Sequence, residues 1–135
     1  MNTIELYKTP SGETQIEVRF EKDSVWLSIN QISELFGRDK SVISRHLKNI
    51  YKEAELEYNS TVAKNATVQK EGKRAITREI EYYNLDAIIS VGYRVNSKKG
   101  TQFRIWATNR LKEYLIHGYS INQKRLDELN QLIQI

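Results

Sequence analysis

The chain has 135 residues, of which 39% are hydrophobic and 28% are charged, a balance typical of one globular domain with its own core. It contains no cysteine, which excludes a disulfide scaffold, a cysteine-ligated zinc site and a thiol nucleophile. It also has no run of about 18 apolar residues and no signal-peptide pattern at the N-terminus, so we expect no membrane partner and predict a cytoplasmic protein.

Positive charge is concentrated in two segments of the chain. The formal net charge of +4 alone is a weak indication of a polyanionic partner, because many proteins are this basic. Residues 87–112, however, contain no acidic residue, and residues 38–52 contain only Asp39. Such a separation of sign along the chain predicts a basic face.

The first part of the chain predicts a small sheet followed by two helices. Residues 3–20 alternate apolar and polar around a proline–glycine turn, which predicts a β-hairpin, and residues 25–28 predict a third strand. Apolar residues then recur at helical spacing over residues 30–36, and Gly37 follows as a left-handed stop. A second helix is expected over residues 40–51.

The second part predicts another hairpin followed by helices. Two β-type runs in residues 60–84 flank Gly72, which is expected at the hairpin tip. Asn84 is the expected N-cap of the helix that follows. The later elements are a helix over 84–95, a polar turn over 96–100, a helix over 101–117 that ends at Gly118, and a last helix over 121–135.

The second of the two early helices has the pattern of a DNA-reading helix. Its apolar residues, including Ile43 and Leu47, form one stripe, and the opposite stripe holds serine, arginine and lysine. In a major groove arginine pairs with guanine and asparagine with adenine, while lysine and serine bind phosphate. Ser33 provides a small residue four positions before the glycine turn, where the two helices of a helix-turn-helix cross closely. His46 stands where a third buried aliphatic residue is expected, and Asp39 is the expected N-cap.

Two further segments add basic residues to this interpretation. A hairpin that follows a helix-turn-helix is a wing, and Lys73 and Arg74 at its tip are placed to contact phosphates. At the head of the helix over 101–117, Lys98 and Lys99 stand beside free backbone N–H groups, which predicts a phosphate clamp. Phe103 and Trp106 lie on the apolar face of that helix and are expected in the core.

Simpler interpretations compete with each of these. An amphipathic helix can have a solvated basic face without binding DNA, and the clamp at residues 96–102 can be a solvated polar turn. The spacing from Ser33 to Gly37 and the hairpin that follows favour DNA binding.

The last helix predicts a contact outside the domain. Leu126, Leu129 and Ile133 fall at i, i+3 and i+7, and no capping residue closes the helix. We expect this stripe to form a homodimer, and the alternatives are that it packs on its own domain or against a missing downstream part. The unclosed helix also suggests an N-terminal fragment of a longer protein.

No pattern predicts catalysis. His46 and His117 are far apart and belong to no metal-ligand or triad spacing. Glu79 and Glu81 share one face of a strand, which favours a solvated sheet face. There is no phosphate-binding glycine loop and no nucleophile elbow, so we expect no enzyme activity, cofactor, metal or small-molecule substrate.

Two long stretches resemble a known family. "VWLSINQISELFGRDKSVISRHLKNIYKEAEL" and "YYNLDAIISVGYRVNSKKGTQFRIWATNRLKEYLIHGY" closely resemble the virulence protein RhuM family of bacteria, over nearly the whole chain. The segment from residue 97 to 119 is similar, more loosely, to Bro-N and phage antirepressor DNA-binding domains, with matches at Phe103, Arg104, Trp106, Gly118 and Tyr119. Some longer relatives carry a downstream domain similar to Fic or Doc proteins, whose HxFx[DE]GN-type stretch is absent here.

These observations together predict an α+β fold, a winged helix-turn-helix-like domain with an N-terminal β-hairpin or meander, a wing hairpin and C-terminal helices. Residues 1–120 would form the DNA-binding domain, and residues 121–135 a helix for dimerisation or for linkage to a downstream domain. The predicted function is sequence-specific or semi-specific binding of double-stranded DNA, by a bacterial transcriptional regulator or by the regulatory module of a RhuM-type protein. The alternative is a protein-interaction module that positions a Fic/Doc-like domain. The predicted DNA-binding residues are Arg38, Lys40, Ser41, Ser44, Arg45, Lys48, Asn49, Lys52, Lys73, Arg74, Lys98, Lys99 and Arg104.

Overall fold

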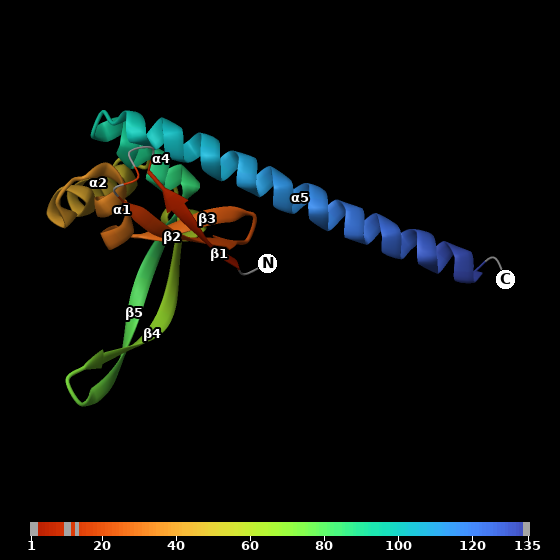
Figure 1. Cartoon of the computed structure of the whole chain (residues 1–135). Coiled ribbons are helices and arrows are strands. Elements are labelled where there is room, and N and C mark those ends of the chain that lie inside the picture. The colour runs from red at the N-terminus through yellow and green to blue at the C-terminus, as the bar shows by residue number, and fades with distance from the viewer. Residues whose placement is uncertain (1–2, 10–11, 13, 134–135) are drawn as a thin grey trace.

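A five-stranded antiparallel sheet with helices packed on one of its faces forms the domain (Figure 1). The structure is a computed structural model that describes residues 3–9, 12 and 14–133, without the side chains at 67, 69, 115, 117–123, 125, 126 and 130–133. The strand order is β1-β2-β3-β5-β4. The predicted α+β class is therefore confirmed.

The N-terminal meander forms as its alternating pattern predicts. Strands β1 (Thr3–Lys8), β2 (Gln15–Glu21) and β3 (Ser24–Ser28) pair in sequence order. The apolar residues of β2 are buried on the helix side, while the polar residues between them point away from the core. The turn between β2 and β3 places Lys22 and Asp23 at positive φ, the backbone twist that suits a two-residue hairpin.

The two helices of the predicted helix-turn-helix follow directly. Helix α1 (Ile29–Phe36) begins at a reciprocal cap in which the Ser28 hydroxyl accepts from the N–H of Gln31, whose side chain accepts from the N–H of Ser28. The helix ends at Gly37, whose φ of 62° confirms the predicted left-handed stop. Helix α2 (Lys40–Lys52) begins at the predicted N-cap, where the Asp39 carboxylate accepts from the Ser41 N–H.

The predicted wing is a hairpin whose two strands belong to the sheet and extend well beyond its other three strands (Figure 1). It follows a one-turn helix, α3 (Tyr58–Thr61), which the sequence patterns did not predict. Strands β4 (Val62–Glu71) and β5 (Arg74–Asn84) pair along their whole length, with Gly72 in the tip. Only the end of β5 pairs with β3, so the rest of the hairpin is a two-stranded ribbon that is exposed on both sides.

The C-terminal helices differ from the prediction. Helix α4 (Leu85–Arg94) begins at the expected Asn84 cap, but the two expected helices after it are one continuous helix, α5 (Lys98–Ile133). The predicted break at Gly118 is therefore wrong. A glycine inside a helix costs only about 1 kcal/mol relative to alanine, and no proline is present there to remove a hydrogen bond. The proposed domain boundary at residue 120 falls inside α5, and that division stays a prediction.

Helices α1, α4 and α5 meet around one aromatic ring. A Cβ added at Gly92 would lie 3.2 Å from Cζ of Phe36, and one added at Gly100 would lie 3.4 Å from Cε1 of the same ring. A Cβ at Gly100 would also lie 3.5 Å from the Cα of Gly92. The two helix backbones therefore approach closely at these glycines, and the Phe36 ring fills the space beside them.

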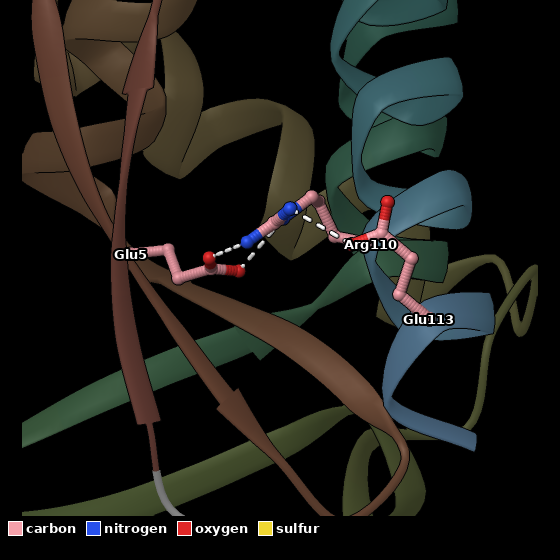
Figure 2. Close-up of polar contacts among 3 residues, drawn as sticks. All are labelled: Glu5, Arg110 and Glu113. Carbon is pink, nitrogen blue, oxygen red and sulfur yellow. Dashed lines mark hydrogen bonds and ion pairs between the residues drawn. The ribbon is translucent and has the colours of Figure 1, made fainter. Parts of the chain in front are cut away.

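The first half of α5 is attached to the sheet by aromatic packing and by one ion pair. The rings of Phe103 and Trp106 contact Tyr7 of β1, with centroids 5.2 and 4.9 Å from the Tyr7 centroid. Phe103 is buried in the core as predicted, and Trp106 is partly buried and packs against the core. Figure 2 shows Arg110 between Glu5 of β1 and Glu113 of its own helix, with Nε of Arg110 donating to Oε2 of Glu5 at 3.0 Å. The hydrogen bond from Arg110 holds the pKa of Glu5 below its ordinary value.

The second half of α5 extends away from the domain (Figure 1). Leu129 is 55% exposed there, and Ile116 is also exposed. The side chains of Leu126 and Ile133, the other members of the predicted dimer stripe, lie outside the described residues. Within the described part of the chain, none of the helices is both long and apolar enough to cross a lipid bilayer.

The glycine crossing gives a test of the fold. Replacing Gly92 by leucine should lower the free energy of unfolding by about 1–3 kcal/mol, because the new side chain must displace the Phe36 ring. Tyr93→Leu is the matched control, since Tyr93 is the next residue of α4 and is 81% exposed. Urea unfolding of both variants measures the difference. Equal stability of the two variants would contradict the close packing at Gly92.

Candidate nucleic-acid interface

Helix α2 separates its apolar and basic residues onto opposite faces, as its pattern predicts. Ile43, Leu47 and Ile50 are at most 3% exposed and pack into the core. The predicted DNA-facing residues on the other side are all exposed, namely Lys40, Ser41, Arg45, Lys48 and Lys52. Neither Arg45 nor Lys48 forms an ion pair with the described residues, so both charges are available to an external anion.

The flank of α2 is partly covered by its neighbours. Ser44 and Asn49, predicted to contact DNA, are half-buried, as is His46. Burial lowers the pKa of His46, and the positive charges of Arg45, Arg94 and Arg38 lower it further. His46, which stands where the helix-turn-helix pattern predicts a buried aliphatic residue, is therefore an imidazole whose neutral form is favoured by burial and by three arginines.

The structure brings the turn of the helix-turn-helix next to the head of α5. Nη2 of Arg38 donates to the carbonyl oxygen of Val95, at the end of α4, over 3.3 Å. Nζ of Lys99 would lie 3.6 Å from a Cβ added at Gly37. Residues 37–38 and 95–99 are thus one surface, although they are about 60 residues apart in the chain.

The cations at the head of α5 are exposed, but its backbone donors are less free than predicted. Lys98, Lys99 and Arg104 point to solvent. The N–H of Lys99 donates to the Ser97 hydroxyl, and the N–H of Gly100 donates to the Ser97 carbonyl. Since these two donors already have partners, the predicted phosphate clamp depends on its side chains.

Other basic residues of these segments are neutralised by acidic side chains of the protein itself. Nη2 of Arg94 lies 2.6 Å from Oε2 of Glu53 and 2.9 Å from Oε2 of Glu55, both just after α2. These hydrogen bonds raise the pKa of Arg94. Arg110 is similarly taken up by Glu5. The basic residues between 87 and 112 are therefore of two kinds: some form ion pairs with acids of the protein itself, and others are exposed and unpaired among the described residues.

The wing divides in the same way. Lys64 pairs with Glu79 at 3.8 Å, and Arg78 pairs with Glu71. Lys73 and Arg74, the predicted phosphate contacts, are exposed at the tip and form no such pair with the described residues. The free positive charge of the wing is therefore placed at its far end.

The base of the wing has a polar contact that the sequence did not indicate. Glu81 was interpreted as part of a solvated face, but it is half-buried and accepts from Tyr58 at 3.0 Å and from Tyr83 at 2.7 Å. Burial and this carboxylate raise the pKa of Tyr83 above its ordinary range. Because Tyr58 belongs to α3, Glu81 links the ribbon to the helical layer. Tyr58 and Glu81 are 23 residues apart in the chain, so no local pattern could have found this contact.

Within the described residues, no group of three or more histidine, cysteine, aspartate or glutamate side chains is arranged to hold a metal ion.

Comparison with known proteins identifies one family. The family described as Virulence protein RhuM family matches residues 60–134, which is more than half of the 135 residues. The match includes the wing, α4 and α5, and it begins after α2, so it is shorter than the resemblance expected from the sequence. No curated protein and no solved structure matches the chain.

The environment of His46 gives a test of this surface. Its pKa should lie below the ordinary histidine value of 6.5, because burial and three arginines oppose its charge. A lowered pKa in the folded state means that the unfolded chain binds the proton more tightly, so this residue reduces stability as the pH falls through 6.5. An NMR titration measures the pKa, and His46→Gln assigns the signal, since the chain has two histidines. A value at or above 6.5 would contradict the described surroundings.

Proposed function

Because the chain belongs to the virulence protein RhuM family, whose description specifies no chemistry, we propose its function from its geometry: it binds double-stranded DNA, with sequence preference, as a regulator of transcription. The recognition element is α2, and the head of α5 and the tip of the wing contact the DNA backbone. No residue is assigned a catalytic role.

One observation carries this proposal: Arg45 and Lys48 are exposed on α2 and pair with no acid among the described residues, whereas nearby cations are neutralised. Arg45 and Lys48 project opposite the buried stripe. Arg94 of α4, by contrast, forms ion pairs with Glu53 and Glu55, which directly follow α2. Unpaired cations on a helix that packs on the core can bind a polyanion. In a major groove, an arginine forms two hydrogen bonds with O6 and N7 of guanine.

The surrounding cations suit phosphate contacts. Lys99 lies beside the turn that precedes α2, so a duplex that received α2 would have its backbone near the head of α5. Lys73 and Arg74 are at the far end of a ribbon that extends from the same domain. Contacts of this kind fix the position of a protein on a duplex and carry no sequence information.

A second function is favoured by the exposed half of α5. Ile116 and Leu129 are exposed apolar residues on a helix that leaves the domain, which suits a protein contact. The chain would then position a downstream domain similar to Fic or Doc proteins and use its basic face little. Salt separates the two functions, because affinity for DNA falls steeply with salt whereas an apolar protein contact is affected much less.

We propose a second copy of this chain as the partner of that helix. Leu126, Leu129 and Ile133 recur at i, i+3 and i+7 in the sequence, the spacing of a helix–helix seam. A dimer also places two recognition helices on the two half-sites of a two-fold DNA site.

The dimer is tested by sedimentation. The chain should sediment as a dimer and Leu129→Glu as a monomer, because a charge in the seam opposes the burial of apolar side chains worth about 1.5–3 kcal/mol each. Lys124→Glu changes an exposed residue of the same helix and should leave the dimer intact. If the unaltered chain is a monomer, the dimer proposal fails.

DNA binding is tested by the affinity for duplex as a function of salt. The logarithm of the association constant should fall linearly with that of the salt concentration, with a slope of about −0.9 for each phosphate neutralised. Arg45→Ala should weaken binding to the preferred sequence by about 1–3 kcal/mol and relax the preference at one base pair. Its melting temperature should stay unchanged, because Arg45 is exposed.

Two comparisons make this result specific. Lys73→Glu with Arg74→Glu should weaken binding to all sequences alike and flatten the salt slope, since phosphate contacts do not read bases. Lys124→Ala removes a charge from the distant part of α5 and should have little effect. Unchanged affinity of Arg45→Ala for every duplex would refute α2 as the recognition helix.

A further inference from the structure

A groove with a volume of about 290 Å³ lies where α4 meets α5. The end of α4 contributes Tyr93, the connecting turn contributes Asn96 and Ser97, and α5 contributes Lys98, Thr101 and Arg104. Gly92 and Gly100 also line it, because the two helices touch there. The volume is close to the lower end of the range for small-ligand sites, about 300 Å³. We refer to it as the Tyr93 groove.

The lining of the Tyr93 groove combines an exposed aromatic ring with positive charge. Tyr93 is 81% exposed, so its ring is open to a ligand. Lys98 and Arg104 provide two cations, neither of which pairs with an acid in the described part of the chain. No acidic side chain is among the described residues that line the groove. Hydroxyl and amide groups at Asn96, Ser97 and Thr101 supply further polar partners.

The groove is held in shape by the fold. The N–H of Asn96 donates to the Tyr93 carbonyl at 3.1 Å, and the N–H of Ser97 donates to the Gly92 carbonyl at 3.1 Å. Behind the groove, the ring of Phe36 supports both glycines. A preformed groove costs less ordering on binding than a flexible surface does, which favours a specific ligand over transient contacts.

This chemistry suits an anion that carries a planar ring. A lone phosphate would use the cations and leave the Tyr93 ring unused, and a neutral aromatic ligand would leave two cations unused. A nucleotide uses both, because its phosphate pairs with lysine and arginine and its base stacks on an aromatic side chain. We propose that the Tyr93 groove binds one nucleotide unit, with the phosphate at Lys98 and Arg104 and the base against Tyr93.

The unit has two possible sources, a free nucleotide or an unpaired nucleotide of a nucleic acid. Bases inside an intact duplex are stacked on each other and cannot stack on Tyr93, so this site is separate from the reading of duplex DNA by α2. Nevertheless the two surfaces are adjacent, because Arg38 bonds to Val95 just before the groove. The two proposals share the cations at the head of α5, but only nucleotide binding in the groove requires the Tyr93 ring, so Tyr93→Ala distinguishes them.

NMR titration of the intact chain with adenosine monophosphate tests the proposal. Saturable shifts should appear at the amides of Tyr93, Ser97 and Thr101. Adenosine and ribose 5-phosphate, which each lack one half of the ligand, should bind at least about tenfold more weakly, as should Tyr93→Ala and Arg104→Ala. Lys112→Ala removes an exposed cation of α5 outside the groove and should bind normally.

A short single-stranded oligonucleotide and a duplex complete the test. Saturation by the mononucleotide supports a free nucleotide as the ligand. Saturation by the single strand alone supports an unpaired nucleotide of a polymer. The proposal is overturned if only the duplex shifts these amides, which would assign the groove to backbone contacts. It is also overturned if Tyr93→Ala leaves binding unchanged, or if none of the three ligands binds.

Discussion

The packing of one aromatic ring against two glycines determines how the parts of this domain are arranged. Phe36 is the last residue of α1, and its ring lies against Gly92 of α4 and Gly100 of α5. Gly37 turns the chain immediately afterwards, so the position of the ring also sets where α2 begins. Interiors are close-packed and resist added volume, which makes this contact sensitive to a single methyl group. The basic face of α2 and the cations at the head of α5 are neighbours because this contact holds α1, α4 and α5 together.

The same arrangement explains why the basic residues differ in their availability. Cations near the acidic segment after α2 or near β1 are taken up within the fold, as Arg94 and Arg110 are. Among the described residues, those on the outer face of α2, at the wing tip and at the head of α5 form no ion pair with an acid. Surface ion pairs contribute little to stability, so the neutralised cations matter chiefly because they remove positive charge from the surface. The free cations that remain are gathered around the turn and at the wing tip.

Local patterns in the sequence were sufficient for α1, for the turn after it and for the start of α2. The apolar spacing up to Phe36, the left-handed Gly37 and the Asp39 cap each act within a few residues, and each is found where expected. The break expected at Gly118 was wrong because a glycine lowers helix stability without preventing a helix. Features that depend on distant residues were not accessible: the Glu81 contact joins α3 to β5, and the groove beside Tyr93 exists only because α4 crosses α5. The exposed face of α2 was predictable as a pattern, whereas the closeness of Lys99 to Gly37 was not.

The central claim is that the faces of α2 and of the head of α5 form one DNA-binding surface. Amide NMR shifts on titration with duplex DNA test it most directly, because they report each residue in the intact chain. The account predicts that the largest shifts fall on residues 38–49 and 98–104, with smaller ones at 73–74 and none on the exposed α5 residues 124 and 127–129. Shifts confined to the distal part of α5, or no shifts on α2 at low salt, would contradict it.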